Sequence, residues 1–479
     1  MLPRIAAVIA TLTAVVLSII HLWHPLDPFD TWSIRLIHLC LGMVIAFLTY
    51  PMIKGKKIGV LDFLFAGLAI VVHAYVLIFM DDIIARFALP TTMDLVMGAI
   101  CIALVLEMTR RVIGLPMVII AIVALLYAYF GEFIPGVLGH RGFSVSRIID
   151  HLYLYLEGIF GVPIGVSATF VILFIIFGAF LQATKTGDFM MNIANSMAGE
   201  ARGGPAKIAV VASGLFGSIS GSAVANVAAT GAYTIPLMKR TGYKSHIAGA
   251  VEAVASTGGQ LMPPIMGAAA FVMAELTGIA YLTIIVAAFL PALLYFSTVQ
   301  IAVHLIAVKT GLKGLNKDEI LSFKRVIIEG GHLIIPLVVL IYMLAVLRMS
   351  PMSAAFWSIV AAVIISSLRK GSRMHPKALI KALEMGAKGA LSVIAACACA
   401  GIIIGVITLT GLGLKLTSII VDVGGGSVLL TLIVVSVAAY FLGMGLPTTA
   451  AYIIVAVLAA PALIELGVPV LAAHLFVFY

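Results

Sequence analysis

Residues 217–226 form the stretch Gly-Ser-Ile-Ser-Gly-Ser-Ala-Val-Ala-Asn inside an otherwise apolar part of the chain, and residues 257–264, Thr-Gly-Gly-Gln-Leu-Met-Pro-Pro, follow about forty positions later. Lipid offers no water to backbone groups, so a spanning helix keeps its own hydrogen bonds. Irregular backbone at membrane depth is tolerated only where protein buries it or where it lines a polar cavity. The two stretches therefore predict broken membrane helices around a polar site.

The composition places the chain in a lipid bilayer. Hydrophobic residues make up 63% of the sequence and charged residues 10%, whereas an ordinary soluble domain is about 25% charged. The net charge of +9 does not indicate a nucleic-acid partner, because the basic residues form short clusters between apolar runs, as cytoplasmic loops do. The sequence predicts an all-α polytopic membrane protein that binds no nucleic acid.

The first five apolar runs of the chain approach the roughly 20 residues that cross a bilayer. They lie near 4–22, 33–53, 58–80, 92–109 and 113–131. The first loop carries Asp27 and Asp30, and the second carries Lys56. Because basic loops stay in the cytoplasm, we expect the N-terminus and Lys56 inside and the acidic loop outside. No small-residue cleavage site follows the first run, which favours a retained helix over a signal peptide.

The apolar segment 205–239 has basic residues at both ends, Lys207 and Lys239. A single crossing would leave one of them outside, so we expect a re-entrant hairpin that turns at residues 217–221. The span that starts at His246 then breaks at Pro263-Pro264. Further spans are predicted near 164–184, 281–308, 331–347, 352–368 and 390–409, an interfacial helix within 133–163, and surface helices at 187–204, 376–389 and 411–425.

The last third of the chain resembles the middle third. Residues 443–452 interrupt an apolar stretch, and its flanks, around Asp422 and Glu465, carry almost no positive charge. The second hairpin is therefore expected to enter from the outside, opposite to the first, which is the pattern of an inverted repeat. In the first unit, Ser222 to His246 spans 24 residues, and Pro263 at the helix break lies 17 residues further on. In the second unit, Thr449 to His474 spans 25 residues, so the matching break would fall near position 491. We expect the second repeat to be incomplete at its C-terminal end.

The polar atoms of the two hairpins and of the helix break are candidate ligands for a dehydrated cation and for an anionic substrate, because hydroxyls, unwound carbonyls and half-helix ends serve these roles in transporters. The alternative for the first hairpin is close packing of helices by small residues, and for the second a glycine–proline kink. The candidate cation ligands are Ser218, Ser220, Gly259, Met262, Pro263, Gly443, Gly445 and Thr448, and the candidate substrate ligands are Ser222, Asn226 and Thr449.

Charged and titratable side chains inside apolar segments are functional candidates. Glu252 lies in the middle of a span, one helical turn from Ser256, and either faces the cavity or pairs with a neighbour. Glu107 precedes two arginines and is interpreted as a structural ion pair, and His38 and His73 as satisfied core histidines. We found no sequence motif for a nucleophile, a metal cluster or a phosphate loop that would indicate an enzyme.

The three motifs together resemble the tripartite ATP-independent periplasmic (TRAP) transporters. They are GSISGSAVANVAATGAYTIPLMKRTGY at 217–243, GGQLMPPIMGAAAF at 258–271 and GMGLPTTAAYIIVA at 443–456. The resemblance covers roughly residues 90–479, and the preceding spans look like the small membrane subunit fused to the large one. The family's second broken helix, with its Thr-Pro-Pro element, is not found in this sequence, which puts the second sodium site in doubt.

The resemblance implies an inverted-repeat, elevator-type transporter with two re-entrant hairpins, in a bacterial or archaeal cytoplasmic (inner) membrane. It implies sodium (Na⁺) as the coupling ion, organic anions, often carboxylates, as substrates, and a periplasmic substrate-binding protein as the partner. By that comparison, Ser218, Ser220, Gly259, Met262 and Pro263 match the first sodium-site motifs, and Gly445 and Thr448 the second. The implied organisation is a four-helix scaffold unit at 1–112, a linking helix at 113–131, a first repeat at 132–330 and a second at 331–479.

Three other functional classes compete with this interpretation. A stand-alone sodium–dicarboxylate or anion symporter of similar hairpin architecture would need no binding protein, but the four-helix N-terminal unit argues against it. A membrane-embedded enzyme lacks a catalytic constellation in the sequence. A channel suits two inverted hairpins with broken helices less well than alternating access does.

Overall fold

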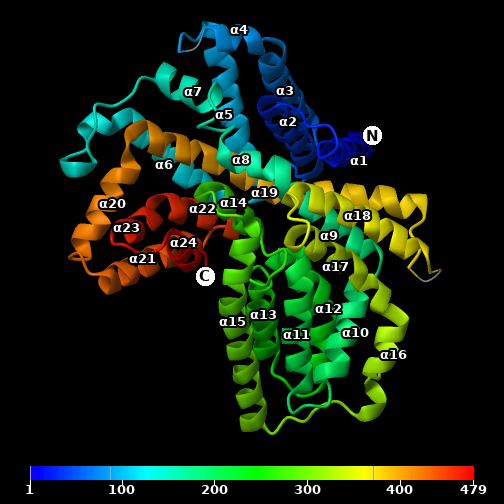
Figure 1. The fold of residues 1–479 in the computed structure, drawn as a ribbon. Helices are drawn as coiled ribbons and strands as arrows, with labels where there is room; N and C mark the ends of the chain where they lie inside the picture. The colour runs from blue at the N-terminus through cyan, green and yellow to red at the C-terminus, as the bar shows by residue number, and fades with distance from the viewer. Residues whose placement is uncertain (1, 87, 370–371) are drawn as a thin grey trace. The chain divides into compact units, whose positions relative to one another are not determined.

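The structure is a computed structural model that describes residues 2–86, 88–369 and 372–479, and the secondary structure of these residues is entirely helical (Figure 1). Nine helical segments in the described part of the chain are long and apolar enough to cross a membrane. The prediction of an all-α polytopic membrane protein is confirmed. The helices belong to two compact units.

Unit 1 comprises residues 1–172, 271–278 and 387–479. Five of its first helices coincide with the five predicted spans: α1 (Leu2–Trp23), α2 (Thr31–Thr49), α3 (Val60–Ile78), α5 (Thr92–Val112) and α6 (Leu115–Phe130). The short α4 (Met80–Ala85) lies between α3 and α5. Local capping sets their starts. The Asp30 carboxylate accepts the backbone N–H groups of Trp32 and Ser33 at the start of α2, and Thr91 caps α5 in the same way through Asp94 N–H.

An ion-pair cluster joins α3 and α5 within unit 1. Arg111 Nη1 donates to Asp62 Oδ1 at 2.6 Å, and Arg111 Nε donates to Glu107 Oε1 at 2.7 Å. Arg110 pairs with the other oxygen of Glu107, also at 2.7 Å. The side chain of Arg111 is 1% exposed, so its charge is stable there only with both carboxylates in place. The expected structural pairing of Glu107 with the arginines is confirmed.

The two core histidines differ from each other. His38 is fully buried, and its ring nitrogens contact His21 Nε2 and Ser167 Oγ, each at 2.9 Å. His73 Nδ1 contacts Ala69 O at 2.7 Å, but His73 Nε2 is buried without a hydrogen-bond partner in the described part of the chain. Both histidines were interpreted as core residues whose ring nitrogens have hydrogen-bond partners. This is confirmed for His38 and is wrong for Nε2 of His73.

The rest of unit 1 consists of short elements and the C-terminal helices: η1 (Gly131–Phe133), η2 (Gly136–Leu138), α7 (Val145–Tyr153), α8 (Val162–Val166), η3 (Ser167–Val171), α20 (Leu412–Val423), α21 (Val428–Gly443), α22 (Thr448–Leu458), α23 (Ala460–Glu465) and α24 (Val470–Phe478). Of the predicted interfacial segment 133–163, residues 145–153 form an amphipathic helix, whose apolar face is buried and whose first turn is exposed.

Unit 2 comprises residues 173–270 and 279–386. Its elements are α9 (Ile172–Ala183), α10 (Thr186–Ala198), α11 (Gly204–Ser220), α12 (Ala223–Arg240), α13 (Ser245–Gly258), the start of α14 (Ala268–Thr277), α15 (Tyr281–Thr310), η4 (Lys317–Glu319), α16 (Phe323–Gly330), η5 (Gly331–Ile334), α17 (Ile335–Ala345) and α18 (Pro351–Ser367). Helices α11, α12 and α13 pack against one another, and α15 packs on α11 and α13 (Figure 1). Many of the core side chains there are alanines and valines, which let the helices approach closely.

One predicted boundary is wrong. We expected a surface helix at 376–389 and a separate span at 390–409, but α19 (Pro376–Thr410) is one continuous helix of 35 residues. A Cβ at Gly386 would lie 2.8 Å from Ile176 Cγ1 and 2.9 Å from Ile176 Cα, so this glycine allows close helix packing and does not end the helix.

Candidate functional site

The turn of the first hairpin lies between α11 and α12. Helix α11 ends at Ser220, Gly221 takes a left-handed conformation with φ of 58°, and Ser222 caps α12 by accepting the N–H of Ala225 at 3.3 Å. A side chain on Gly221 would also collide with the carbonyl oxygen of Met266. The turn needs glycine for both reasons, and it lies where the sequence predicts it.

The hairpin packs directly on the broken helix. Helix α13 ends at Gly258, and residues 259–267 are irregular before α14. A Cβ on Gly259 would lie 2.6 Å from Gly217 Cα, so the two backbones touch without side chains between them. Ile265 N–H donates to Ser218 O at 3.1 Å. The unwound backbone is thus buried in protein, as lipid requires.

Asn226 links the hairpin to α13. Its side chain is fully buried, and Nδ2 donates to Ser213 O at 2.9 Å and to Ser256 O at 3.4 Å. The amide nitrogen therefore holds α11, α12 and α13 together. Binding of substrate by Asn226, together with Ser222, stays a prediction.

Two serines of the first candidate cation site differ in their hydrogen bonds. Ser218 Oγ donates to Leu215 O at 2.8 Å. Ser220 Oγ is buried and has no hydrogen-bond partner in the part of the chain that the structure describes. A buried hydroxyl without a partner is costly unless something else satisfies it. The donor set of neutral oxygens and this open hydroxyl fit a small hard cation.

A pocket of about 390 Å³ opens beside this arrangement within unit 2. It brings together Ser218, Met262 and Pro263 with residues of α15, of which Gln300 Oε1 is buried without a hydrogen-bond partner among the described residues. Ser220, Ser222, Asn226 and Gly259 do not line it. The complete lining is Val210, Val211, Gly214, Leu215, Ser218, Met262, Pro263, Phe296, Ser297 and Gln300.

The second hairpin lies in unit 1. Helix α21 ends at Gly443, and α22 begins at Thr448 after Pro447. The side chain of Thr449 is buried, and a Cβ on Gly445 would lie 3.3 Å from Pro116 Cβ. The four predicted residues lie at this tip: Gly443 ends α21, Gly445 lies in the turn, and Thr448 and Thr449 begin α22. Their roles in binding a cation or a substrate stay predictions.

Comparison with known proteins identifies the family. The sequence pattern of the family described as "Tripartite ATP-independent periplasmic transporter, DctM component" matches residues 100–479. The chain belongs to this family. The TRAP resemblance of the three motifs is thereby confirmed.

Three relatives show the extent of the similarity. One relative is the C4-dicarboxylate TRAP transporter large permease protein DctM of Pseudomonas aeruginosa, to which the chain is 33% identical over 134 residues. The aligned part covers 28% of this chain and 31% of that protein. The chain is 37% identical over 91 residues to the isethionate TRAP transporter permease protein DctMQ of Oleidesulfovibrio alaskensis. This alignment covers 19% of this chain and 14% of that protein. A putative TRAP transporter large permease protein of Haemophilus influenzae is 31% identical to this chain over 91 residues. This alignment covers 19% of this chain and 21% of that protein. The chain thus matches less than a third of each relative's length.

The hydroxyl groups that surround Glu252 in this TRAP family member are not apparent from its sequence. The carboxylate of Glu252 is fully buried and accepts hydrogen bonds from four hydroxyls, those of Ser213, Thr230, Thr234 and Ser256. The sequence contains a signal for part of this set. Thr230 and Thr234 are four residues apart, so they share one helix face, but which face meets Glu252 depends on packing.

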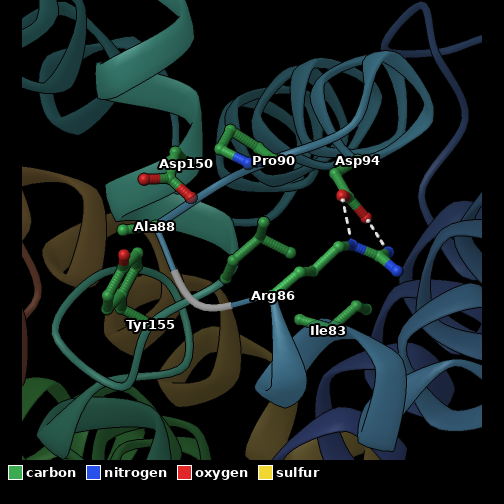
Figure 2. Close-up of a pocket in the computed structure, with 8 residues that line it drawn as sticks. Ile83, Arg86, Ala88, Pro90, Asp94, Asp150 and Tyr155 are labelled. Atoms are coloured by element: carbon green, nitrogen blue, oxygen red, sulfur yellow. Dashed lines mark hydrogen bonds and ion pairs between the residues drawn. The ribbon is translucent and has the colours of Figure 1, made fainter.

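A second, smaller cavity lies in unit 1 between α4, α5 and α7 (Figure 2). Arg86 pairs with Asp94 there at 2.9 Å. Burial raises the pKa of Asp150 from its ordinary value, although the neighbouring Arg147 partly offsets it. The free space is only about 10 Å³, which holds at most one water molecule. This cavity is too small to bind an organic anion.

Proposed function

We propose that this chain is the permease component of a sodium-coupled secondary transporter, which imports organic anions, often carboxylates, delivered by a periplasmic substrate-binding protein. The membrane is the cytoplasmic membrane of a bacterium or archaeon, with the N-terminus inside. Membership in the TRAP family over residues 100–479 supports the transporter class. Relatives named for C4-dicarboxylates and isethionate support small organic anions as substrates.

The observation that carries the proposal is the contact between the hairpin tip and the broken helix. There, Ser220 Oγ is buried without a hydrogen-bond partner in the described chain. Ser220 ends the helix whose Gly217 backbone touches Gly259, where α13 stops. A bound sodium ion needs several oxygen ligands, and neutral hydroxyl and carbonyl oxygens can serve as these ligands. Ser218 and Ser220 would hold it with carbonyls of Gly259, Met262 and Pro263.

The same contact supports an elevator-type mechanism. In alternating access of this kind, a body that carries the site moves against a scaffold. Asn226 ties α11, α12 and α13 together through two backbone carbonyls, and Gly217 and Gly259 touch through their backbones. Hairpin and broken helix can therefore move as one rigid body that keeps the ligand atoms in place.

Thermal stability in different salts tests the cation site without requiring transport. A ligand that binds only the folded chain raises its unfolding temperature by mass action. We expect NaCl to stabilise the purified chain more than equal KCl, and Ser220→Ala to reduce this difference. Ser196→Ala is a matched control, because the Ser196 hydroxyl donates to Ile193 O on α10 and should leave the sodium effect unchanged.

Uptake into proteoliposomes tests the complete proposal. The chain is reconstituted with its cognate binding protein, and labelled succinate and isethionate serve as the probes. We expect sodium-dependent uptake of at least one probe, and a higher sodium requirement for Ser220→Ala than for Ser196→Ala. Sodium activation that is the same in the alanine variants of Ser218, Ser220 and Ser222 would mean that these serines only pack helices.

A further inference from the structure

The carboxyl group of Glu252 lies in a cage of hydroxyl groups inside unit 2. Thr230 Oγ1 donates to Oε1 at 2.5 Å, and Ser256 Oγ donates to the same oxygen at 3.0 Å. Ser213 Oγ lies 3.4 Å from it, and Thr234 Oγ1 donates to Oε2. The donors come from α11, α12 and α13, so the cage forms only when these three helices pack together.

In the part of the chain that the structure describes, this carboxyl group has no ion-pair partner. Among the described residues, no Lys, Arg or His nitrogen lies within 4 Å of the Glu252 carboxylate. The nearest basic residue on its own helix, His246, lies six residues away, about 9 Å along the axis. The charged and titratable residues of α13 and of the helices packed on it are Lys207, Tyr233, Lys239, Arg240, His246, Tyr281, Tyr295, His304 and Lys309.

A buried carboxylate without a counter-charge is unstable and tends to take up a proton. We propose that Glu252 is a proton-binding site that couples proton movement to transport: its carboxylate takes up one proton from water and becomes a neutral acid, and later releases that proton and becomes a carboxylate again. This inference rests on the proposed transport function. It adds a second coupling ion, at a site separate from the predicted sodium ligands.

The cage can stabilise both forms of the carboxyl group without moving heavy atoms. Each hydroxyl has one proton to donate. Thr230 Oγ1 lies 2.8 Å from Asn226 O, and Thr234 Oγ1 lies 3.0 Å from Thr230 O. When Glu252 is ionised, both threonines donate to it. When Glu252 is neutral, the hydroxyl of Thr230 can donate to Asn226 O, or that of Thr234 to Thr230 O. The same hydroxyl oxygen can then accept the proton of the acid.

The spacing of the oxygens favours a proton over a metal cation. A hard cation such as Ca²⁺ lies about 2.3–2.6 Å from each oxygen ligand, which keeps ligands of an octahedral site about 3.4 Å apart. Thr230 Oγ1 and Ser256 Oγ lie 2.5 and 3.0 Å from Glu252 Oε1. Both hydroxyl oxygens are thus at hydrogen-bond distance from the carboxylate oxygen, closer than two ligands of one cation would lie.

The cage is linked to the predicted substrate and cation region. Ser213 O and Ser256 O both accept hydrogen bonds from Asn226 Nδ2, and a Cβ on Gly231 would lie 3.0 Å from Glu252 Cγ. A change in the charge of Glu252 therefore acts on the three helices whose ends form the hairpin tip and the helix break. Protonation can thus influence the predicted site.

Infrared spectroscopy of the purified chain tests the proposal directly. As the pH falls, the difference between the wild-type and Glu252→Gln spectra should show the growing carbonyl band of one neutral carboxylic acid. Glu157→Gln is the matched control, because the side chain of Glu157 is 60% exposed and the band should remain.

A transport measurement gives the second readout. In proteoliposomes at fixed sodium, an inward proton gradient should increase succinate or isethionate uptake in the wild type and in Glu157→Gln, but not in Glu252→Gln. A band that does not titrate while the chain stays folded, or the same gradient response in Glu252→Gln, would overturn the role of Glu252. Absence of uptake by the wild type in all salts would count against the transporter proposal, and the infrared titration would still decide whether Glu252 binds a proton.

Discussion

Replacing Gly259 by alanine tests the backbone contact that positions the candidate site. Gly259 has φ of −58°, which any residue can adopt, so the effect is steric. The new methyl would lie 2.6 Å from Gly217 Cα and 2.7 Å from Asn226 Nδ2. Overpacking of this kind costs about 1–3 kcal/mol. We expect the upper half of that range, because one neighbour is backbone and the other is held by two hydrogen bonds.

Gly249→Ala is the matched control on the same helix, because a Cβ there meets nothing within 4 Å. Both substitutions reduce the freedom of the unfolded chain by about the same 0.4–1 kcal/mol, so their difference measures the clash alone. For a unit of roughly 200 residues, a clash of about 2–3 kcal/mol lowers the unfolding midpoint by about 4–12 °C relative to the control.

The assay heats detergent-purified protein and then measures the monodisperse fraction by size-exclusion chromatography. We expect the midpoint for Gly259→Ala to lie below that of the wild type, and that for Gly249→Ala at or slightly above it. Equal midpoints for the two variants would refute the close approach of the hairpin and the broken helix. The contact would then not hold the candidate ligands in place.

Three further predictions use the same purified protein or whole cells. Arg111→Met leaves two carboxylates without their buried partner and should destabilise the chain by about 3–5 kcal/mol. The side chain of Arg110 is more exposed, so Arg110→Met should destabilise it by less than about 1 kcal/mol. Thermal unfolding of the two variants measures the difference. Gly221→Ala should destabilise more than Gly426→Ala, since both have positive φ but only the first meets a backbone oxygen, and the same unfolding assay ranks them. A cysteine at Lys239 should resist impermeant thiol reagents applied to intact cells; labelling there would contradict the re-entrant topology.

The positions of the helices could be predicted from the sequence, because they depend on local properties. A run of apolar residues forms a membrane helix wherever lipid withholds water from the backbone, so the five N-terminal spans match α1 to α6 closely. Glycine and proline mark the interruptions for the same reason, and the turn at Gly221 and the break after Gly258 lie where the motifs place them. The boundary at residues 389 and 390 was wrong, because local sequence does not show that α19 continues and that Gly386 serves a close packing contact.

The partners of the site residues depended on tertiary structure. Asn226 is a candidate substrate ligand in the sequence, but packing directs its amide nitrogen to two backbone carbonyls. Ser218 and Ser220 look equivalent, yet only Ser220 Oγ is left without a partner among the described residues. The four hydroxyls around Glu252 lie at positions 213, 230, 234 and 256. Sequence determines which residues share a helix face, but only the packing of three helices decides which of those faces meet.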